Sequence, residues 1–354
     1  MRLDAFTKRV MRKNKSNQSR LPLTISAQYG LVDQITFFNK VVASTDLSNY
    51  YLLKKGEFAY NKSYSSDYPW GAIKRLDNYD QGALSSLYIC FAPQDNVVSD
   101  FILQYFESPK WHKGISEIAV EGARNHGLLN VAVQDFFHTY HYVPKDKKEQ
   151  IKISKLLMLL DERIATQNKI IDKLQSLIKG IAQKIVHSNK PNVCLSECLE
   201  CKTSTLQESD VCEHGVYPVY GANGIVGYLD NYNTEGEAVY IIKDGSGVGT
   251  VSYVTGKCSA TGTLNTLQAK EGYSLQYLYY LLKVFNFEPY KTGMAIPHIY
   301  FKDYGKAKVF CPSYTEQLRY ARLLSAIDNK LSIEQNILTE LRLQKQYLLC
   351  QMFI

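Results

Sequence analysis

A helix-like segment occurs twice in this chain, and this internal repeat constrains the possible folds more than any other feature. The second copy follows the first after a shift of 167 positions. The first copy carries Glu149, Gln150, Asp161, Arg163, Ile164, Ile170, Ile171 and Leu174, and the second carries Glu316, Gln317, Asp328, Lys330, Leu331, Ile337, Leu338 and Leu341. Because such a repeat decides the architecture before any local assignment, the sequence predicts two similar halves in tandem.

Weaker similarity extends into the segments that precede the two helices. The matches are Tyr29-Gly30 with Tyr220-Gly221, residues 56–60 with 236–240, and residues 131–136 with 299–304. The residues between these matches are almost unrelated, and the first segment is longer than the second. This pattern indicates one scaffold that carries two different globular domains.

Each copy of the repeated segment contains apolar residues at alternating spacings of three and four, which is a heptad seam. The first seam includes Leu157, Leu160, Ile164, Gln167, Ile171 and Leu174, and the second includes Leu324, Ile327, Leu331, Glu334, Leu338 and Leu341. At about 1.5 Å per residue, each helix should be roughly 55 Å long. The relation between the halves predicts that the two helices pack antiparallel.

Further apolar residues lie outside the seam, at Ile170, Leu177, Ile333 and Ile337. A second apolar stripe on a helix covers either additional core or another subunit. The sequence leaves both possibilities open.

The remaining segments contain short Tyr, Phe and Val-rich runs separated by turn residues, which is typical of β-rich domains. We therefore predict an α+β fold with pseudo-twofold symmetry, in which two β-rich domains in tandem are separated by two long antiparallel coiled-coil helices. The predicted boundaries are 1–142 for the first domain, 143–190 for the central helix, 191–309 for the second domain and 310–354 for the C-terminal helix.

Composition limits the partners and the compartment. The formal charge of +7 and the pI near 8.8 suit a polyanionic partner, although a solvated basic surface explains them equally well. No apolar run approaches the length of a membrane span. The basic N-terminus lacks an apolar segment after its charges, so we expect a cytoplasmic protein without a secretory signal.

Four cysteines near the start of the second half, Cys194, Cys198, Cys201 and Cys212, lie close to His214 in the sequence. Such a set could be drawn as a zinc site. The matching segment of the first half has no cysteine, so the shared fold does not need a metal here. We expect reduced, buried thiols instead.

Recognisable catalytic motifs are missing, and we expect a protein that is not an enzyme and needs no cofactor. The glycine-rich run 244–249 follows an apolar strand, but a β-branched run comes after it. A phosphate-binding loop must lead into a helix, so this run predicts a hairpin turn. Its glycine-rich tip could still approach a DNA backbone.

Polar and basic residues in loops are the remaining candidates for binding. Such side chains suit contacts to phosphates or base edges, although an ordinary surface turn or a structural histidine explains some of them. The candidates are Lys62 and Tyr64 after one predicted strand, Arg124, Asn125 and His126 in a glycine-flanked loop, Lys243 and Ser246 after the matching strand, and His298.

Together these features resemble the DNA-specificity subunits of type I restriction-modification systems. The resemblance covers nearly the whole chain and includes the repeated Glu-Gln pattern at 149–164 and 316–331. The strings 25–32, 59–64 and 121–128 also resemble the target recognition domains of that family. The resemblance adds Gln28 and Tyr29 as candidate DNA contacts, with Tyr220 and Asn223 in the second half.

The resemblance implies a division of labour within a larger complex. Each globular domain would read one half of a split, asymmetric site in double-stranded DNA, and the helices would set the spacing between the half-sites. Two methyltransferase (modification) subunits would supply the S-adenosylmethionine chemistry, and restriction/translocase subunits would join through the complex. The alternative is a tandem adaptor that binds proteins through its coiled coil and its tyrosine-rich surfaces.

Overall fold

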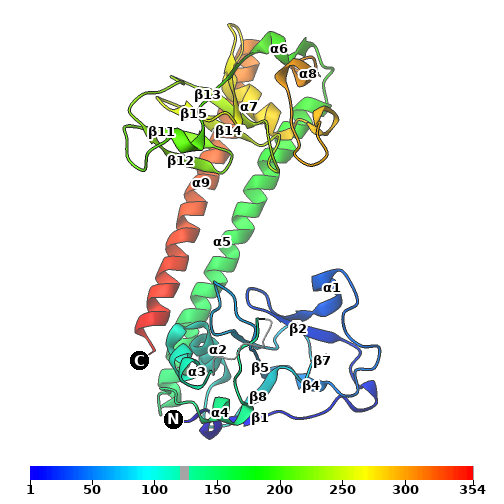
Figure 1. The fold of residues 1–354 in the computed structure, drawn as a ribbon, viewed down its shortest axis with the longest axis vertical. Coiled ribbons are helices and arrows are strands. Elements are labelled where there is room, and N and C mark those ends of the chain that lie inside the picture. Colours follow the sequence, from blue (N-terminus) through cyan, green and yellow to red (C-terminus); the bar gives the residue numbers. More distant parts are fainter. Residues whose placement is uncertain (120–126, 354) are drawn as a thin grey trace. The chain divides into compact units, whose positions relative to one another are not determined.

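The computed structural model describes residues 1–119 and 127–353, and the chain forms two compact units. The first unit comprises residues 1–166 and 338–354, and the second comprises residues 167–337. Two long helices, α5 (Lys147–His187) and α9 (Tyr314–Gln351), each contribute one part to each unit (Figure 1). The heptad pattern predicted both helices, and the structure confirms them.

The first unit contains two four-stranded sheets. One has the order β1-β8-β5-β6 and consists of β1 (Thr7–Arg9), β8 (Ile89–Pro93), β5 (Phe58–Asn61) and β6 (Ala72–Arg75). The other has the order β3-β2-β7-β4 and consists of β3 (Gly30–Asp33), β2 (Pro22–Ser26), β7 (Gln81–Leu84) and β4 (Tyr51–Lys54). The short helices are α1 (Gln34–Phe38), α2 (Ser99–Glu107), α3 (His112–Ile118) and α4 (Val133–His138).

Aromatic side chains fill the main core of this unit. Phe58 stacks on Phe91 at a centroid distance of 5.4 Å, and Tyr60 stacks on Phe136 at 5.0 Å. The same core cluster includes Leu157 of α5 and residues at the end of α9. The first globular domain is therefore packed directly onto its segments of the long helices, and burial of large aromatic rings stabilises that packing.

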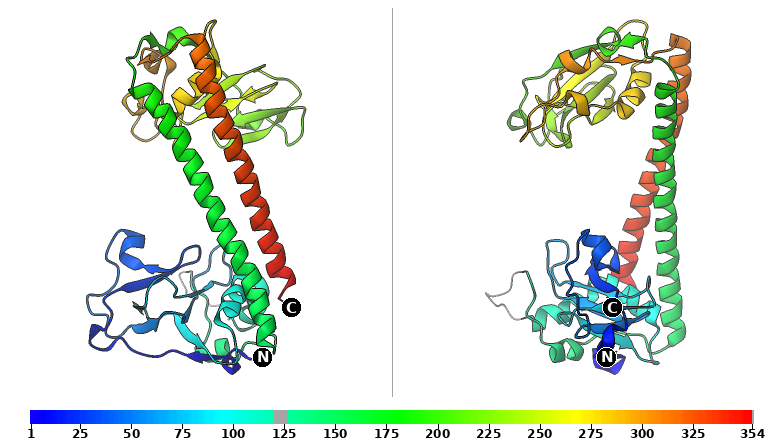
Figure 2. Two further views of the ribbon diagram at one scale, coloured as in Figure 1. Left: turned by 180° about the vertical axis from the view of Figure 1, so that it is seen from behind. Right: turned by 90° about the vertical axis from the view of Figure 1, so that its right-hand side faces the viewer.

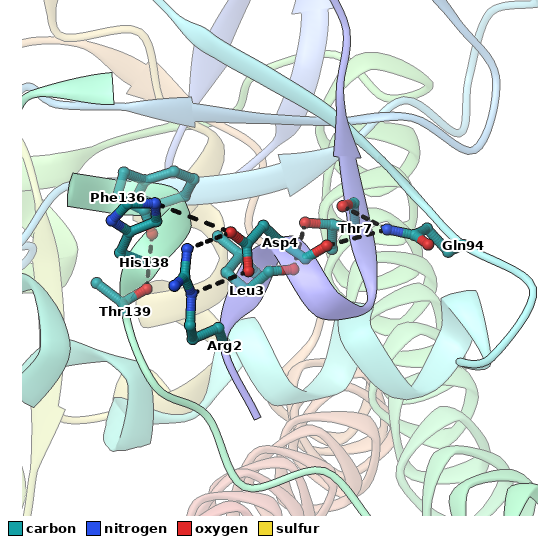
Figure 3. Close-up of polar contacts among 8 residues, drawn as sticks. All are labelled: Arg2, Leu3, Asp4, Thr7, Gln94, Phe136, His138 and Thr139. Carbon is teal, nitrogen blue, oxygen red and sulfur yellow. Dashed lines mark hydrogen bonds and ion pairs between the residues drawn. The ribbon is translucent and has the colours of Figure 1, made fainter. Parts of the chain in front are cut away.

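The N-terminal segment begins with a single 3-10 turn, Leu3–Ala5, and continues directly into β1. Figure 3 shows how its polar groups are held. Arg2 pairs with Asp4 at 2.6 Å, and His138 at the end of α4 lies 3.9 Å from the same carboxylate. The Gln94 side chain donates to the carbonyl of Thr7 at 2.8 Å. These contacts attach the basic start of the chain to α4 and to the segment after β8.

The second unit repeats the arrangement with fewer residues. Its larger sheet has the order β10-β16-β13-β14 and consists of β10 (Leu199–Thr203), β16 (Leu264–Ala269), β13 (Ala238–Ile242) and β14 (Val251–Val254). A smaller sheet, β12-β11-β15, consists of β12 (Gly224–Leu229), β11 (Tyr217–Gly221) and β15 (Ser259–Ala260). A strand pair, β9 (Val193–Cys194) and β17 (Lys308–Val309), and the helices α6 (Leu195–Cys198), α7 (Leu275–Val284) and α8 (Phe301–Tyr304) complete it.

The β2–β3 hairpin of the first unit and the β11–β12 hairpin of the second unit correct one of the sequence matches. The second strand of each hairpin begins with a glycine of positive φ, Gly30 at 79° and Gly224 at 102°. Gly221 instead ends the first strand of its hairpin and pairs with Gly224. Tyr29 therefore corresponds to Asn223, and the match of Tyr29 to Tyr220 is wrong by three positions. Insertions in the first domain hid the correct register from the sequence comparison.

A buried glutamine joins each globular domain to the start of its own long helix. In the first unit, Gln150 accepts from the backbone N–H of Val98 at 2.7 Å and donates to the carbonyl of Pro144 at 2.7 Å. Because the bond to Val98 lies at the N-terminus of α2, the glutamine caps that helix from outside it. One side chain thus ties α2, α5 and the connection between them.

Gln317 makes the same joint in the second unit. It accepts from the N–H of Ser274, at the start of α7, and donates to the carbonyl of Pro312, both at 2.9 Å. Gln150 and Gln317 are only 1% and 2% exposed, so neither bond is replaced by water. The repeated Glu-Gln pattern in the sequence is therefore the repeat of a structural joint.

A second contact of the repeat lies about three turns further along each helix. Asp161 accepts a bond from Gln104 of α2 at 2.9 Å, and Asp328 accepts one from the Tyr280 hydroxyl of α7 at 3.2 Å. Asp161 also binds Lys345 of α9. The aspartate of the repeat thus links the short helix to the long one in both units.

Within each unit the segments of α5 and α9 run antiparallel and lie side by side (Figure 2). In the second unit, Gln167 contacts Glu334, while Asn192, just after α5, binds the backbone of Cys311, just before α9, at 2.7 and 2.8 Å. The seam residues are all buried or half-buried. By contrast, Leu177, Ile333 and Ile337 are exposed and Ile170 is half-buried, so the second stripe is not additional core of this chain.

The two polar seam residues bind each other. The Gln167 amide donates to both the backbone carbonyl and the carboxylate of Glu334, and Lys330 pairs with the same carboxylate at 2.5 Å. These hydrogen bonds lower the pKa of Glu334 below its usual value of 4.5. A buried polar pair of this kind fixes the register of two paired helices.

We predict that Gln150→Ala and Gln317→Ala each lower the free energy of unfolding by about 1–3 kcal/mol, because each change leaves buried backbone groups without a partner. Urea unfolding followed by circular dichroism measures this loss. Lys152→Ala, at an exposed position of α5, is the control and should change the value by less than about 0.5 kcal/mol. Losses no larger than that of the control would show that the joint is not a stabilising contact.

We also predict that Glu334 makes stability depend on pH. A carboxyl whose pKa is lower in the folded state stabilises the fold above its unfolded pKa, and this contribution is lost as the pH falls through the folded pKa. The wild type should therefore lose stability relative to Glu334→Gln as the pH falls from about 6 to about 3, because protonation removes the contribution of the carboxylate. The exposed Glu340→Gln serves as control, and an identical pH profile for both variants would contradict the prediction.

Candidate nucleic-acid interface

The candidates Lys243, Ser246 and His298 lie close together in the second unit. Lys243 directly follows β13, and its carbonyl accepts from the N–H of Ile299 at 2.9 Å. The N–H of Gly245 binds the carbonyl of Pro297 at 2.9 Å. The loop after β13 and the segment around His298 are therefore paired, although more than fifty residues separate them in the sequence. We refer to residues 243–246 and 297–299 as the β13 loop cluster.

His298 and Asp244 form a close side-chain pair within the β13 loop cluster. Nδ1 of His298 lies 2.6 Å from Oδ1 of Asp244, and both side chains are about one third exposed. The His298 ring stacks on Tyr300 at 6.5 Å, and Nζ of Lys302 lies 5.3 Å from the centroid of that tyrosine ring. The sequence did not single out Asp244, Tyr300 or Lys302, and only the fold brings Asp244 to His298.

The glycine-rich run is a hairpin connection, as predicted. Strands β13 and β14 pair antiparallel on either side of it, with Ile241 opposite Val251. Gly245 and Gly249 adopt positive φ values of 96° and 91°, which glycine tolerates without strain. Because no helix follows the run, it lacks the helix N-terminus that holds a nucleotide phosphate.

Lys62 and Tyr64 occupy the corresponding place after β5 in the first unit. The carbonyl of Lys62 accepts from the N–H of Leu129 at 2.9 Å, and the N–H of Tyr64 donates to Gly127 at 3.0 Å. Tyr64 is half exposed. This pairing repeats that of Lys243 with Ile299, so both lysines leave a strand end at equivalent positions. Arg124, Asn125 and His126 lie outside the described residues.

Gln28 and Tyr29 form the exposed turn between β2 and β3. Tyr29 is 68% exposed, and its ring lies 6.3 Å from that of Phe37 in α1. Phe37 and Phe38 are also exposed, with ring centroids 5.1 Å apart. This aromatic tip was not among the candidates predicted from the sequence. The adjacent phenylalanines within a polar stretch were the signal that could have indicated it.

Tyr220 and Asn223 are placed differently from each other. Asn223 is exposed in the turn between β11 and β12. Tyr220 lies in β11, half-buried, with its ring 5.6 Å from that of Tyr240 in the core, and burial raises its pKa. Tyr220 thus packs against the core of its unit, while Asn223 occupies the place that Tyr29 has in the first unit.

The cysteines of the second half are arranged differently from our expectation of buried thiols. Cys198 is buried and lies 3.8 Å, sulfur to sulfur, from Cys311. Cys212 is exposed, and Cys194 and Cys201 are half-buried, so that expectation is wrong for three of the four. Across the part of the chain that the structure describes, no three His, Cys, Asp or Glu side chains are grouped to hold a metal ion.

The candidate side chains offer positive charges and hydrogen-bond donors and acceptors on loops that are held by backbone pairing. Such groups suit contacts with phosphates and base edges. Within the described residues, no helix is long and apolar enough to cross a bilayer.

A family model described as "Type I restriction modification DNA specificity domain" matches residues 188–343 of the chain. Two curated relatives match over shorter segments. One is the type I restriction enzyme EcoprrI specificity subunit of Escherichia coli, 28% identical over 116 residues, which are 33% of this chain and 29% of the relative. The other is a putative type I restriction enzyme specificity subunit of Haemophilus influenzae, 35% identical over 82 residues, 22% of this chain and 21% of the relative. The matched segments thus span less than a third of either relative.

Solved structures match along the whole chain. The S subunit of the type I restriction-modification system of M. genitalium superposes with a TM-score of 0.65 and 18% identity, and covers 100% of this chain and 95% of that one. A chain from a study of complex assembly and conformational transition of the type I R-M system superposes with a TM-score of 0.58 and 14% identity. That match covers 99% of this chain and 96% of the other. These two likenesses show the shared α+β fold. The family model and the relatives show that part of the chain is similar to type I restriction-modification specificity subunits.

Proposed function

We propose that this chain is the DNA-reading subunit of a type I restriction-modification complex, in which each globular domain reads one half of an asymmetric, bipartite site in double-stranded DNA. The proposal rests on one contrast: the two units share the contacts that hold each domain on its long helix, but their exposed loops differ. The glutamine joint recurs in both units, and the sheet β1-β8-β5-β6 has the same strand arrangement as β10-β16-β13-β14. The loops at the strand ends differ in length and in chemistry. A shared scaffold with unlike loops suits two readers of different sequences.

The surfaces of the two units support unlike readout. The first offers Lys62, Tyr64 and the exposed aromatic tip around Tyr29, and the second offers Lys243, Ser246 and the Asp244–His298 pair. Lysines suit phosphates, whereas hydroxyl, amide and imidazole groups suit base edges. Because the two sets of side chains differ, the half-sites should differ as well.

The long helices are proposed to hold the spacing of the half-sites. Each is a single uninterrupted helix, of 41 residues for α5 and 38 for α9. A continuous helix would keep the two DNA-reading domains at a constant distance. Linking two modest half-site contacts also raises the overall affinity for DNA, because the second contact forms at a high effective concentration. The buried Gln167–Glu334 pair would keep the helices in one register.

In this proposal the chain is the non-catalytic component of its complex. Two methyltransferase subunits are the proposed direct partners, and restriction/translocase subunits would join through that complex. The exposed apolar residues Leu177, Ile333 and Ile337 are proposed as part of the docking surface, because apolar patches left on a helix favour burial against a partner.

Co-expression with the modification gene tests the proposal. The purified complex should contain two methyltransferase subunits for each copy of this chain and should bind duplex DNA with an affinity that falls steeply with salt, because counterions are released from the phosphates. A chain that purifies alone, or a complex whose DNA affinity ignores salt, would contradict it. Salt-insensitive protein binding would instead favour a tandem adaptor.

We predict that Lys62→Ala and Lys243→Ala each weaken DNA binding by the complex to a similar extent for all sequences. Loss of one phosphate contact should reduce the slope of log affinity against log salt by about 1. Fluorescence anisotropy at several salt concentrations measures that slope. Lys308→Ala, exposed on β17 near the helix ends, is the matched control and should leave it unchanged. An unchanged slope in both loop variants would remove these lysines from the interface.

A further inference from the structure

The pair of Asp244 and His298 in the β13 loop cluster is more rigidly built than a surface contact requires. Backbone bonds hold His298 on both sides. Its N–H donates to Thr292 at 2.7 Å, its carbonyl accepts from Thr292 at 2.9 Å, and its chain neighbours bind Lys243 and Gly245. The ring position is therefore set by the backbone as well as by the side-chain contact of 2.6 Å with Asp244.

Asp244 decides which ring nitrogen of His298 carries a proton. An ionised carboxylate only accepts hydrogen bonds, so Nδ1 must donate to Asp244. Nε2 is then the nitrogen left for an external partner, and the described residues provide no hydrogen-bond partner for it. With the side chain about one third exposed, Nε2 is accessible to a ligand.

The charge of the pair depends on the proton at Nε2. A neutral imidazole leaves the net charge of Asp244 and His298 at minus one, whereas an imidazolium makes the pair neutral. Phosphates repel an uncompensated carboxylate and attract an N–H donor, so a nearby DNA backbone favours the imidazolium. DNA binding at this place should therefore be coupled to uptake of a proton.

Three lysines and one further carboxylate, Asp303 of α8, lie near the pair in space or in the chain. Lys243 precedes Asp244 in the chain, and Lys302 lies over the Tyr300 ring that stacks on His298. Lys291, next to Thr292, is paired with Glu288 at 2.5 Å. Asp244 is the carboxylate in direct contact with His298, and protonation of His298 is the direct way to compensate its charge.

We propose that Asp244 is a positioning residue that holds His298 with its Nε2–H toward a DNA phosphate, so that DNA binding by the second unit takes up one proton. This inference rests on the proposed DNA-reading function. It deepens that function by assigning His298 a phosphate contact and by making the affinity of one half-site depend on pH.

The test measures the affinity of the complex for a duplex that carries the methylated site of the host, at constant ionic strength between about pH 6 and about pH 8. The wild-type affinity should fall as the pH rises, approaching about tenfold per pH unit for one proton. His298→Asn can still donate to Asp244 but cannot titrate, so its affinity should lose this pH dependence. Asp244→Asn should reduce the pH dependence, because Nδ1 loses its charged acceptor.

The control is His214→Asn, an exposed histidine of the same unit, which should keep the wild-type pH profile. Circular dichroism of each variant checks that the fold is retained. If His298→Asn binds DNA with the same pH dependence as the wild type, the inference is overturned while the proposed function stands. If no protein binds DNA in a salt-sensitive manner at any pH, the proposed function itself fails.

Discussion

The buried glutamine at the start of each long helix is the contact on which the organisation of this protein depends. Gln150 and Gln317 each bridge the N-terminus of a short helix and the proline carbonyl that precedes the long helix. A buried amide satisfied at both ends is costly to displace, because either backbone group left alone loses its hydrogen bond. The joint therefore fixes each globular domain on its helix while leaving the loops at the far strand ends free to differ.

The separation of the glutamine joint from the loops would allow one fold to serve the two half-sites that we propose. The aspartates of the repeat illustrate it, because Asp161 binds a glutamine and Asp328 binds a tyrosine without any change of role. The partner residue at this contact therefore differs between the units while the hydrogen bond to the aspartate is kept. The side chains differ more in the loops that we propose to read DNA. The Asp244–His298 pair and the aromatic tip around Tyr29 are products of that divergence.

The sequence predicted the parts of the fold that follow from periodicity. The two helices, their seam and the hairpin after β13 all depend on local patterns of apolar, β-branched and glycine residues. The roles of Gln150 and Gln317 could not be predicted, because their partners Val98 and Ser274 are distant in the chain. The match of Tyr29 to Tyr220 failed because insertions shifted the hairpin register, which only the strand pairing reveals.

The sequence indicated which types of residue form the candidate site, but it did not indicate which of them lie together in the fold. Lysines after matched strands indicated Lys62 and Lys243, and the structure places them at equivalent strand ends. Asp244 escaped notice because a carboxylate is an unexpected neighbour for DNA. Its significance depends on the 2.6 Å contact with His298, which no spacing in the sequence encodes.

The central claim is that each globular domain reads its own half-site while the helices hold the spacing. Methylation mapping of the host genome tests it most directly, with the native chain and with a chain whose residues 1–142 come from another specificity subunit. We expect that one half-site changes while the other half-site and the spacing stay the same. A change in both half-sites or in the spacing would contradict it.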